Sequence, residues 1–542
     1  MAKAVHPRRT RFVPVRLSLA DLVGKDYVDA VVAARAALAG DDARELRRLA
    51  REKVDFLPVS FLKAQVGLLP RVGGNIARPL RESSPGASTA AFNAATHPAM
   101  APLTGWGCYR IGEDGRLHFI LKSEHYHAPL GHGFPGYRLL EHARRLGIPN
   151  ATHNNTRGHI TRLLEAELVR TANGLPYGDD AALAKAVRTR RPGVLNRVLN
   201  LETGSLAAEA GIKMMLARFY RIQQDSPEPQ QSGTIHVIAV IGDDAGGLQA
   251  NYHGTTILAQ ALRGMWHDLR IRLENDGFLK IVSVRPNNFD DLENAFARHA
   301  RNRYKLAGFI YEIVLMNYGG RLLSRKFVRR IHELARKHGV PTMVDEIQTG
   351  VWSTELFMFR EYGVRPTLVA VGKGFPGGEY PASRIVFQAQ MDTMPQFGAL
   401  VTNGQEELAS LAYLVTMRWA EANAAVTCGI GEYYSQELRR LVETHPQHLS
   451  KIEGCRHLAS LYFHELDAAK EFVKLLANGG LDISVQAYKA NCPPGALTKL
   501  PLIAGYEAVD MVIARMDGAL RRLADQECHE DTKTLGTRRR GR

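Results

Sequence analysis

Between about residue 190 and residue 402, short apolar segments alternate with amphipathic ones, and this alternation constrains the fold more than any other feature. The apolar segments have the length of strands, and the segments between them carry apolar residues at helical spacing. Such an alternation predicts a mostly parallel sheet covered by helices on both faces. The expected strands are residues 234–242, 278–284, 306–315, 341–347, 367–372 and 383–387, and the clearest helices between them are 286–302 and 324–339.

A chain of 542 residues is too long for one compact unit, so we expect further parts around this centre. The predicted fold class is α/β, with a large domain and a smaller α+β domain built from both chain ends. A Gly-Ser turn at residues 204–205 should begin a long helix of the large domain. The expected divisions are a basic tail and helical extension (1–90), the N-terminal part of the small domain (91–190), the large domain (191–402), the C-terminal part of the small domain (403–525) and a second basic tail (526–542).

The net charge of +15 is concentrated at the two ends of the chain. Residues 1–16 contain five Lys or Arg and no acid, and residues 532–542 contain another five and no acid. Such tails are either solvated termini or arms that bind a polyanion, and the first interpretation makes a nucleic-acid partner improbable.

The sequence indicates a protein of the cytoplasm. Its five cysteines are scattered and never form C-x-x-C, which is typical of a reducing compartment. No run of about 18 apolar residues and no secretory signal is visible, so no membrane contact is expected.

Lys373 directly follows the expected strand 367–372 and lies in the sequence Gly-Lys-Gly-Phe-Pro-Gly. This sequence fits the G-x-G-x-x-G pattern, but residues 378–387 leave no room for the helix that a dinucleotide-binding turn requires. The loop G-x-x-x-x-G-K-[ST] does not fit either, because position 374 is Gly. Lys373 is therefore either a surface lysine or an amine that, partly removed from water, attacks a carbonyl group.

Residues at other strand ends supply what a pyridoxal phosphate site needs besides a lysine. Asp345, at the end of strand 341–347, can keep the pyridine nitrogen protonated. Gly204 and Ser205, at the start of a helix, offer backbone N–H groups and a hydroxyl to a phosphate. Tyr252 can lie over the ring. Together these residues favour a pyridoxal phosphate enzyme.

The chain resembles the class III aminotransferases, a family of fold-type I pyridoxal-phosphate enzymes, over roughly residues 100–525. An ordered set of segments carries the resemblance: 109–135, ending in Leu-Gly-His-Gly-Phe-Pro; the phosphate turn 203–210; Tyr-His-Gly-Thr-Thr at 252–256; Val-Asp-Glu-Ile-Gln-Thr-Gly at 344–350; and Lys373. The resemblance implies that Lys373 forms a Schiff base with the cofactor, and that Asp345 binds the pyridine nitrogen. It further implies cofactor-binding roles for Gly204, Ser205, Tyr252, His253, Gln348 and Thr402, the last reaching the phosphate of a partner chain in a homodimer.

The chain departs from the family in two segments that bear on the substrate. Glu312 remains from an E-P-x-Q-G-E-G-G segment whose proline and second acid are absent here. Lys499 is the nearest match to an arginine that grips the substrate carboxylate, and a lysine cannot form the same two-pronged contact. Glu312 and Lys499 are the candidate substrate-binding residues.

The resemblance implies transfer of an amino group from an amino acid or amine to an oxo acid or aldehyde. The same site would also serve an aminomutase, a decarboxylase or a racemase, and a non-catalytic relative that binds a polyanion or a protein is the alternative of another class. His125, His127 and His132 fall in the family's L-G-H-x-x-P segment, so no metal site is expected. Glu346 should point away from Asp345 across the strand and have a structural role.

Overall fold

The computed structural model describes residues 11–299, 303–486 and 492–539. The chain divides into two compact units. The large unit contains residues 13–56 and 135–425, and the small unit contains residues 1–12, 57–134 and 426–542. The basic residues Lys3, Arg8, Arg9, Arg540 and Arg542 lie outside the described residues. The domain boundaries given above stay a prediction.

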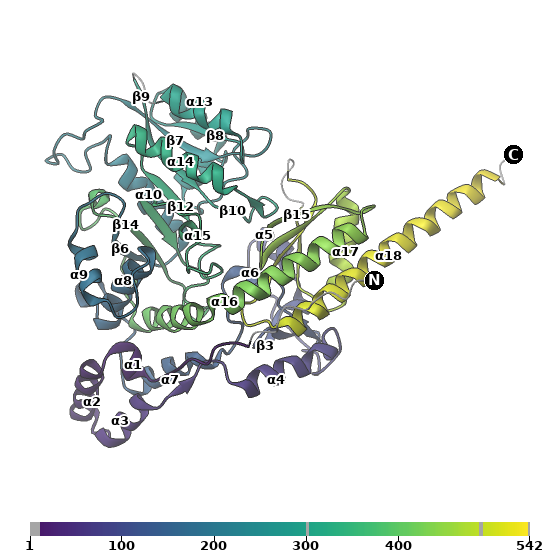
Figure 1. Ribbon diagram of the computed structural model, residues 1–542, viewed down its shortest axis with the longest axis horizontal. Helices are drawn as coiled ribbons and strands as arrows, with labels where there is room; N and C mark the ends of the chain where they lie inside the picture. The colour runs from purple at the N-terminus through teal and green to yellow at the C-terminus, as the bar shows by residue number, and fades with distance from the viewer. Residues whose placement is uncertain (1–10, 300–302, 487–491, 540–542) are drawn as a thin grey trace. The chain divides into compact units, whose positions relative to one another are not determined.

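The large unit contains a seven-stranded sheet with the strand order β6-β14-β13-β12-β9-β7-β8 (Figure 1). All neighbouring pairs are parallel except the two that β14 forms with β13 and β6. The prediction of an α/β fold with a mostly parallel sheet is thus confirmed. The strands are β6 (Leu195–Leu201), β7 (Ile235–Ile241), β8 (Lys280–Val284), β9 (Tyr304–Tyr311), β12 (Thr342–Asp345), β13 (Leu368–Val371) and β14 (Ser383–Gln388).

The antiparallel direction of β14 follows from its short connection to β13. A parallel return needs a crossover of a dozen or more residues, usually with a helix. Residues 372–382 contain no helix here, and Gly377 and Gly378 turn the chain with φ values of +65° and +83°. The connection 372–382 is thus too short for a dinucleotide-binding helix, and for the same reason β14 runs antiparallel to β13.

Helices pack against this sheet along its length. Helix α10 packs along β13 and β14, and α13 packs along β8 and β9. Gly211 lets α10 approach closely, because a Cβ there would lie 2.5 Å from Met343 Sδ on β12. Apolar side chains of α10 and of the strands form a continuous buried cluster. The helices after β6 are α10 (Gly204–Leu216), α11 (Ile257–Leu262), α12 (His267–Asn275), α13 (Phe289–His299), α14 (Arg325–His338) and α15 (Met358–Glu361).

Residues 13–56 fold as a helical extension of the large unit. Ser18 and Asp21 form a capping box at the start of α1, and the Asn423 side chain bonds the backbone of Val13. Tyr27 stacks on His159 with ring centroids 4.4 Å apart. These contacts fasten the extension to the unit. Its elements, with the helices that precede β6, are β1 (Arg16–Leu17), α1 (Leu19–Val23), α2 (Lys25–Ala39), α3 (Ala43–Arg51), β2 (Val54–Asp55), α7 (Arg138–Arg145), α8 (His159–Ala172) and α9 (Asp180–Arg188).

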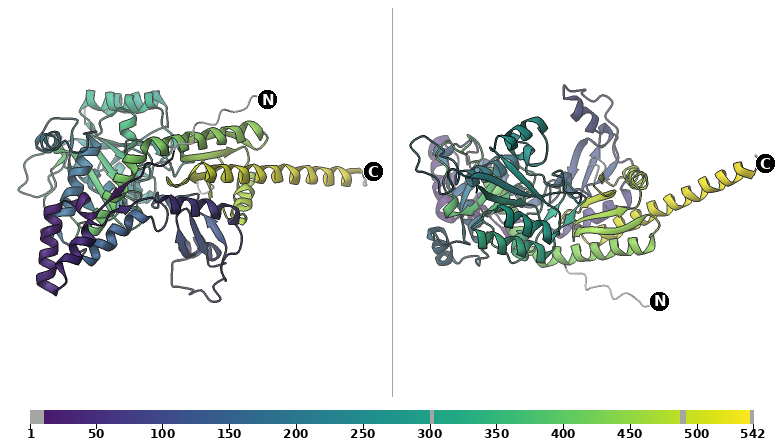
Figure 2. Two further views of the ribbon diagram at one scale, coloured as in Figure 1. Left: turned by 60° about the horizontal axis from the view of Figure 1, so that its bottom comes forward. Right: turned by 90° about the horizontal axis from the view of Figure 1, so that it is seen from above.

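The small unit has two antiparallel sheets, with the orders β15-β16-β18-β17 and β3-β4-β5. Figure 2 shows its last helix, α18, as one continuous helix. No helix among the described residues is long and apolar enough to cross a membrane. The elements are α4 (Val59–Leu68), α5 (Ala90–Ala95), β3 (Pro102–Trp106), β4 (Tyr109–Gly112), β5 (Leu117–Phe119), α6 (Ser123–Tyr126), β15 (Leu449–Cys455), β16 (Leu458–Phe463), α17 (Leu466–Asn478), β17 (Ser484–Gln486), β18 (Gly495–Lys499) and α18 (Tyr506–Arg539), while α16 (Glu407–Thr444) begins in the large unit.

Candidate active site

Most of the predicted site residues follow the carboxyl ends of parallel strands in the large unit. Because these strands run in one direction, the residues that follow them gather at one edge of the sheet, where open α/β sheets bind ligands. Gly204 and Ser205 follow β6, Tyr252 and His253 follow β7, Glu312 follows β9, Asp345 ends β12 and Lys373 follows β13.

Lys373 occupies a conformation that a lysine rarely adopts. Its φ is +42°, in the left-handed region. The flanking glycines are required by close packing, since a Cβ at Gly372 would lie 2.2 Å from Ser383 Oγ and one at Gly374 would lie 2.5 Å from Trp352. Non-glycine residues held in this region cluster at functional sites. The chain therefore places the Lys373 side chain at some cost in backbone energy.

The surroundings of Lys373 lower the pKa of its amine. Removal from water disfavours the charged form, and the nearby carboxylates of Glu312 and Asp345 oppose this effect without cancelling it. The structure thus brings three of the predicted site residues together. A lowered pKa makes more of the neutral amine available, which is the form that attacks a carbonyl or takes a proton.

Asp345 is buried, and two donors orient its carboxylate. His253 Nδ1 donates to Oδ2 at 2.9 Å, and the backbone N–H of Ile347 donates to Oδ1 at 3.1 Å. The other nitrogen of His253, Nε2, is buried and has no hydrogen-bond partner among the described residues. The imidazole of His253 therefore orients the Asp345 carboxylate through Nδ1, and its Nε2 can form a further hydrogen bond.

Glu312 and Gln348 form a second buried pair. Gln348 Nε2 donates to Glu312 Oε1 at 3.0 Å, and both residues are almost fully inaccessible to water. The contact places Gln348, in the turn after β12, beside the residue that follows β9. It also explains how Glu312 keeps a fixed position although the residues after it differ from the family pattern.

The start of α10 and residues 254–255 form a small polar cradle. Ser205 Oγ accepts from the backbone N–H of Thr255 at 3.0 Å and lies 3.2 Å from Thr255 Oγ1. A Cβ at Gly254, where φ is +111°, would lie 2.6 Å from Ser205 Cα, so only glycine permits this approach. The first N–H groups of α10 and two hydroxyls can therefore meet a phosphate here.

Three predicted residues are placed without a visible role. The guanidinium of Arg263 lies 5.0 Å from the centre of the Tyr252 ring, so one face of that ring already has a cationic neighbour. Thr402 is exposed in the loop before α16. Lys499 ends β18 in the small unit and is fully buried, with its backbone bonded to Leu121 and Ser123. The functions proposed for these residues stay predictions.

Glu346 is the neighbour of Asp345 and is engaged elsewhere. Its carboxylate accepts from Thr349 Oγ1 and from the backbone N–H of Phe359 at the start of α15. Complete burial raises the pKa of Glu346 to about 7. It thus ties the turn after β12 to α15, in agreement with the structural role expected for it.

Sequence reasoning missed the hydrogen bond between His253 and Asp345 and the hydroxyl of Thr255. His253 and Thr255 both fall inside the Tyr-His-Gly-Thr-Thr segment, and that segment is the sequence feature that points to them. The pairing of His253 with Asp345 joins positions 92 residues apart, so it becomes visible only when β7 and β12 share a sheet edge.

Solved structures share this fold. The ornithine aminotransferase from Toxoplasma gondii matches with a TM-score of 0.62, covering 79% of this chain and 91% of that chain at 18% identity. The adenosylmethionine-8-amino-7-oxononanoate aminotransferase from Methanocaldococcus jannaschii matches with a TM-score of 0.62, covering 82% and 98% at 16% identity. At these identities the likeness establishes the fold, which is that of fold-type I pyridoxal-phosphate enzymes.

Residues 159–490 match the family described as aminotransferase class-III, and the chain belongs to that family. It is 27% identical over 215 residues to the acetylornithine aminotransferase of Aquifex aeolicus (38% of this chain, 52% of the relative). It is 28% identical over 245 residues to the ornithine aminotransferase of Emericella nidulans (42% and 50%). The matched region spans about half the length of these curated relatives.

Membership in the family implies pyridoxal phosphate as the cofactor. The residues present fit this group on three observations. The cradle of Ser205, Gly254 and Thr255 suits a phosphate, the oriented carboxylate of Asp345 suits a pyridine N–H, and the amine of Lys373 lies near that carboxylate. The orphaned Nε2 of His253 adds a buried polar atom that a bound group could satisfy.

Proposed function

We propose that the protein is an aminotransferase that moves an amino group from an amino acid or amine to an oxo acid or aldehyde. The observation that carries the proposal is the grouping of Lys373 with Asp345 and Glu312, where burial lowers the pKa of the lysine amine. Family membership supports it. A lysine of this kind serves both as a nucleophile toward carbonyl groups and as a base.

Each residue has a defined part in the proposed mechanism. Pyridoxal phosphate, when bound, supplies an aldehyde and a protonated ring that withdraws electrons from the substrate α-carbon. Lys373 Nζ would hold the cofactor through its aldehyde and, as a free amine, would take the proton of the substrate α-carbon. Asp345 keeps the ring nitrogen protonated, and His253 holds Asp345 in place through Nδ1.

The remaining residues bind rather than react. Ser205, Thr255 and the first N–H groups of α10 would hold the phosphate, and Gln348 would contact the ring hydroxyl. Glu312 contacts the amino substrate, and a substrate-binding role for Lys499 stays a prediction. The Tyr252 ring would cover one face of the cofactor.

We also propose a homodimer, in which Thr402 reaches the phosphate held by the partner chain. Supporting this, large apolar side chains are exposed in the segment 257–269, close in sequence to the phosphate cradle. They are Ile257, Met265, Trp266 and Leu269. A cytoplasmic location is supported by the thiols of Cys108 and Cys428, which form no disulfide in this structure.

A visible absorption spectrum with added pyridoxal phosphate tests the role of Lys373. Wild type and Lys326→Ala, which removes an exposed lysine on α14, should both show a band that an amino substrate bleaches. Lys373→Ala should lack this band and should lose activity by about three orders of magnitude or more. A band that survives in Lys373→Ala would exclude Lys373 as the attachment point.

Steady-state kinetics separate transamination from the other reactions that this site could support. An aminotransferase requires a second, oxo substrate and shows ping-pong kinetics, because the enzyme keeps the amino group after the first oxo product has left and before the oxo acceptor binds. A decarboxylase releases carbon dioxide, and a mutase or racemase needs no acceptor. Turnover that continues without any oxo acceptor would therefore contradict the proposal.

A further inference from the structure

A cavity of about 590 Å³ opens at the amino edge of the large sheet, opposite the candidate active site. Arg365 stands three residues before β13 and borders this cavity, whereas Lys373 follows the other end of the same strand. Val194 borders the cavity and precedes β6, whose opposite end leads to Ser205. Four residues of strand span roughly 13 Å, so the cavity is a separate place in the same unit.

Among the residues that the structure describes, basic side chains border the cavity and no acidic one does. Lys185, Arg191, Arg360 and Arg365 all line it. Arg360 is paired with Glu355 through two hydrogen bonds and lies against Gly174. Lys185, Arg191 and Arg365 are exposed, and none of them forms an ion pair with another residue that the structure describes. Three side chains with positive charges therefore border one hollow, and no ion pair is formed by them among the described residues.

The walls between these charges are apolar. They include Ala182 and Ala186 of α9, Val194 and Leu195 at the start of β6, and Phe359 of α15. A concave site with mainly apolar walls and a few convergent polar groups is the usual form of a small-molecule site, at volumes of roughly 300–1,000 Å³. A bare inorganic ion would leave these walls uncovered.

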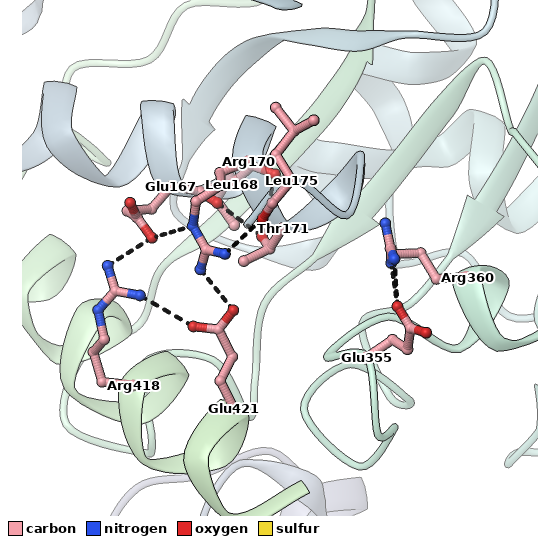
Figure 3. A network of polar contacts seen from close by, with 9 residues as sticks. All are labelled: Glu167, Leu168, Arg170, Thr171, Leu175, Glu355, Arg360, Arg418 and Glu421. Atoms are coloured by element: carbon pink, nitrogen blue, oxygen red, sulfur yellow. Dashed lines mark hydrogen bonds and ion pairs between the residues drawn. The ribbon is translucent and has the colours of Figure 1, made fainter. Parts of the chain in front are cut away.

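A network of ion pairs holds the wall that contains Leu175 (Figure 3). Arg170 Nη1 donates to the Leu175 carbonyl at 3.0 Å, and the same guanidinium contacts Glu167 at 2.9 Å and Glu421 at 2.6 Å. Arg418 bonds both of these carboxylates. The charges of this network are paired with one another, so the network fixes the shape of the wall. Its carboxylates do not pair with Lys185, Arg191 or Arg365, whose charges can therefore contact a ligand.

We propose that this cavity binds a small organic anion that has a flat or apolar body and two or more negative charges on phosphate or carboxylate groups. The body lies against Phe359, Ala186 and Val194, and the charges meet Arg191, Arg365 and Lys185. Arginine in particular forms two-pronged contacts with both kinds of anion. The proposal rests on the cavity and is independent of the aminotransferase proposal.

Titration calorimetry on the full chain, loaded with pyridoxal phosphate and then freed of excess cofactor, tests the proposal, because the bound cofactor blocks its own phosphate cradle and no free cofactor competes for the cavity. The probes are AMP, phthalate and inorganic phosphate, which carry similar charge on different bodies. We expect one site for AMP, for phthalate or for both, with inorganic phosphate bound at least tenfold more weakly. AMP alone would identify phosphate as the preferred group, and phthalate alone would identify carboxylate.

The double variant Arg191→Gln/Arg365→Gln should raise the Kd of the bound probe roughly tenfold or more, since two charge-assisted contacts are lost. The matched control is Arg44→Gln/Arg48→Gln, which removes two exposed arginines from α3 in the same unit and should leave the Kd unchanged. Three results would each overturn the proposal: no probe bound at millimolar concentration, equal weakening in both double variants, or inorganic phosphate bound as tightly as AMP and phthalate.

Discussion

At the scale of single residues, the two hydrogen bonds to Asp345 allow its charge to be removed without loss of the fold. In Asp345→Asn the amide oxygen can still accept from Ile347. His253 can exchange tautomers, since its Nε2 has no partner among the described residues. We expect activity to fall by about 10²–10³-fold, because the ring nitrogen loses its counter-charge.

The measurement for this variant is kcat/KM together with a melting curve. Asp243→Asn is a suitable control, because Asp243 is likewise buried and accepts from two backbone N–H groups. Activity of Asp345→Asn within tenfold of wild type would remove Asp345 from the mechanism.

Glu346 predicts a pH dependence of stability. Its pKa in the folded chain is about 7, above the ordinary value of 4.5. Between these two pH values the Glu346 carboxyl group is protonated in the folded chain and ionised in the unfolded chain. This contribution is fully present below pH 4.5 and is lost as the pH rises through 7. Glu346→Gln lacks this titrating group and therefore this contribution. Between pH 5 and pH 8 the free energy of unfolding of wild type should therefore fall by up to roughly 3 kcal/mol relative to that of the variant.

Urea unfolding of both proteins at the two pH values measures this difference. Gln can accept from Phe359 and donate to Thr349, so the contacts of α15 survive the substitution. If the free energy of unfolding changes by the same amount in wild type and variant between the two pH values, the pKa of Glu346 is not raised by folding.

Much of the candidate site could be anticipated from residue order. Lys373, Asp345 and Glu312 each lie at or near the carboxyl end of an apolar strand, and parallel strands bring such positions to one edge. The partners of these residues could not be anticipated in the same way. Which atom of His253 faces Asp345, and whether Gln348 reaches Glu312, depend on side-chain rotamers that a linear pattern does not contain.

At the scale of elements, the loop between β13 and β14 depends on a contact between Gly377 and Tyr137. A Cβ at Gly377 would lie 1.5 Å from the Tyr137 hydroxyl, which is hydrogen-bonded to Thr416 at 2.7 Å. Gly377→Ala should therefore displace this loop, lower stability and reduce activity through Lys373. Gly246→Ala is the matched control, because Gly246 also has positive φ but no atom within 4 Å of the added methyl.

Gly246→Ala should lower the free energy of unfolding by about 1 kcal/mol through backbone strain alone. Gly377→Ala should lower it clearly more, since buried groups must move. Denaturant unfolding with cofactor absent measures both values. Equal costs would mean that the contact with Tyr137 relaxes freely.

The secondary structure predicted from the sequence was correct where apolar runs are long. Each of the six expected strands is present, and the helices 286–302 and 324–339 appear as α13 and α14. Strand β6 was not assigned, because its Asn196, Arg197 and Asn200 interrupt the apolar pattern. These polar side chains are accommodated by partners outside the strand: Asn196 donates to the Ala186 carbonyl, and Asn200 donates to the Glu165 carboxylate, 35 residues away in sequence.

At the scale of the whole molecule, the proposed dimer can be tested at the segment 257–269. The exposed side chains of Ile257 and Trp266 should be covered by the partner, and a charge placed there should oppose association. Wild type should sediment at twice 60.0 kDa, and Ile257→Glu/Trp266→Glu should dissociate at micromolar concentration. The control Phe278→Glu, which also alters an exposed apolar residue, should remain dimeric. A monomeric wild type would refute the dimer.

The left-handed backbone of Lys373 makes activity and stability compete at this position. A lysine there bears the strain of positive φ, of order 1–2 kcal/mol, and also the partial loss of hydration of its amine. Asparagine or glycine would avoid both penalties, so the apoprotein should become more stable when its proposed catalytic residue is replaced. A selection of variants by melting temperature alone would therefore enrich inactive chains changed at position 373, and thermostabilisation of this protein must be screened for turnover at every round.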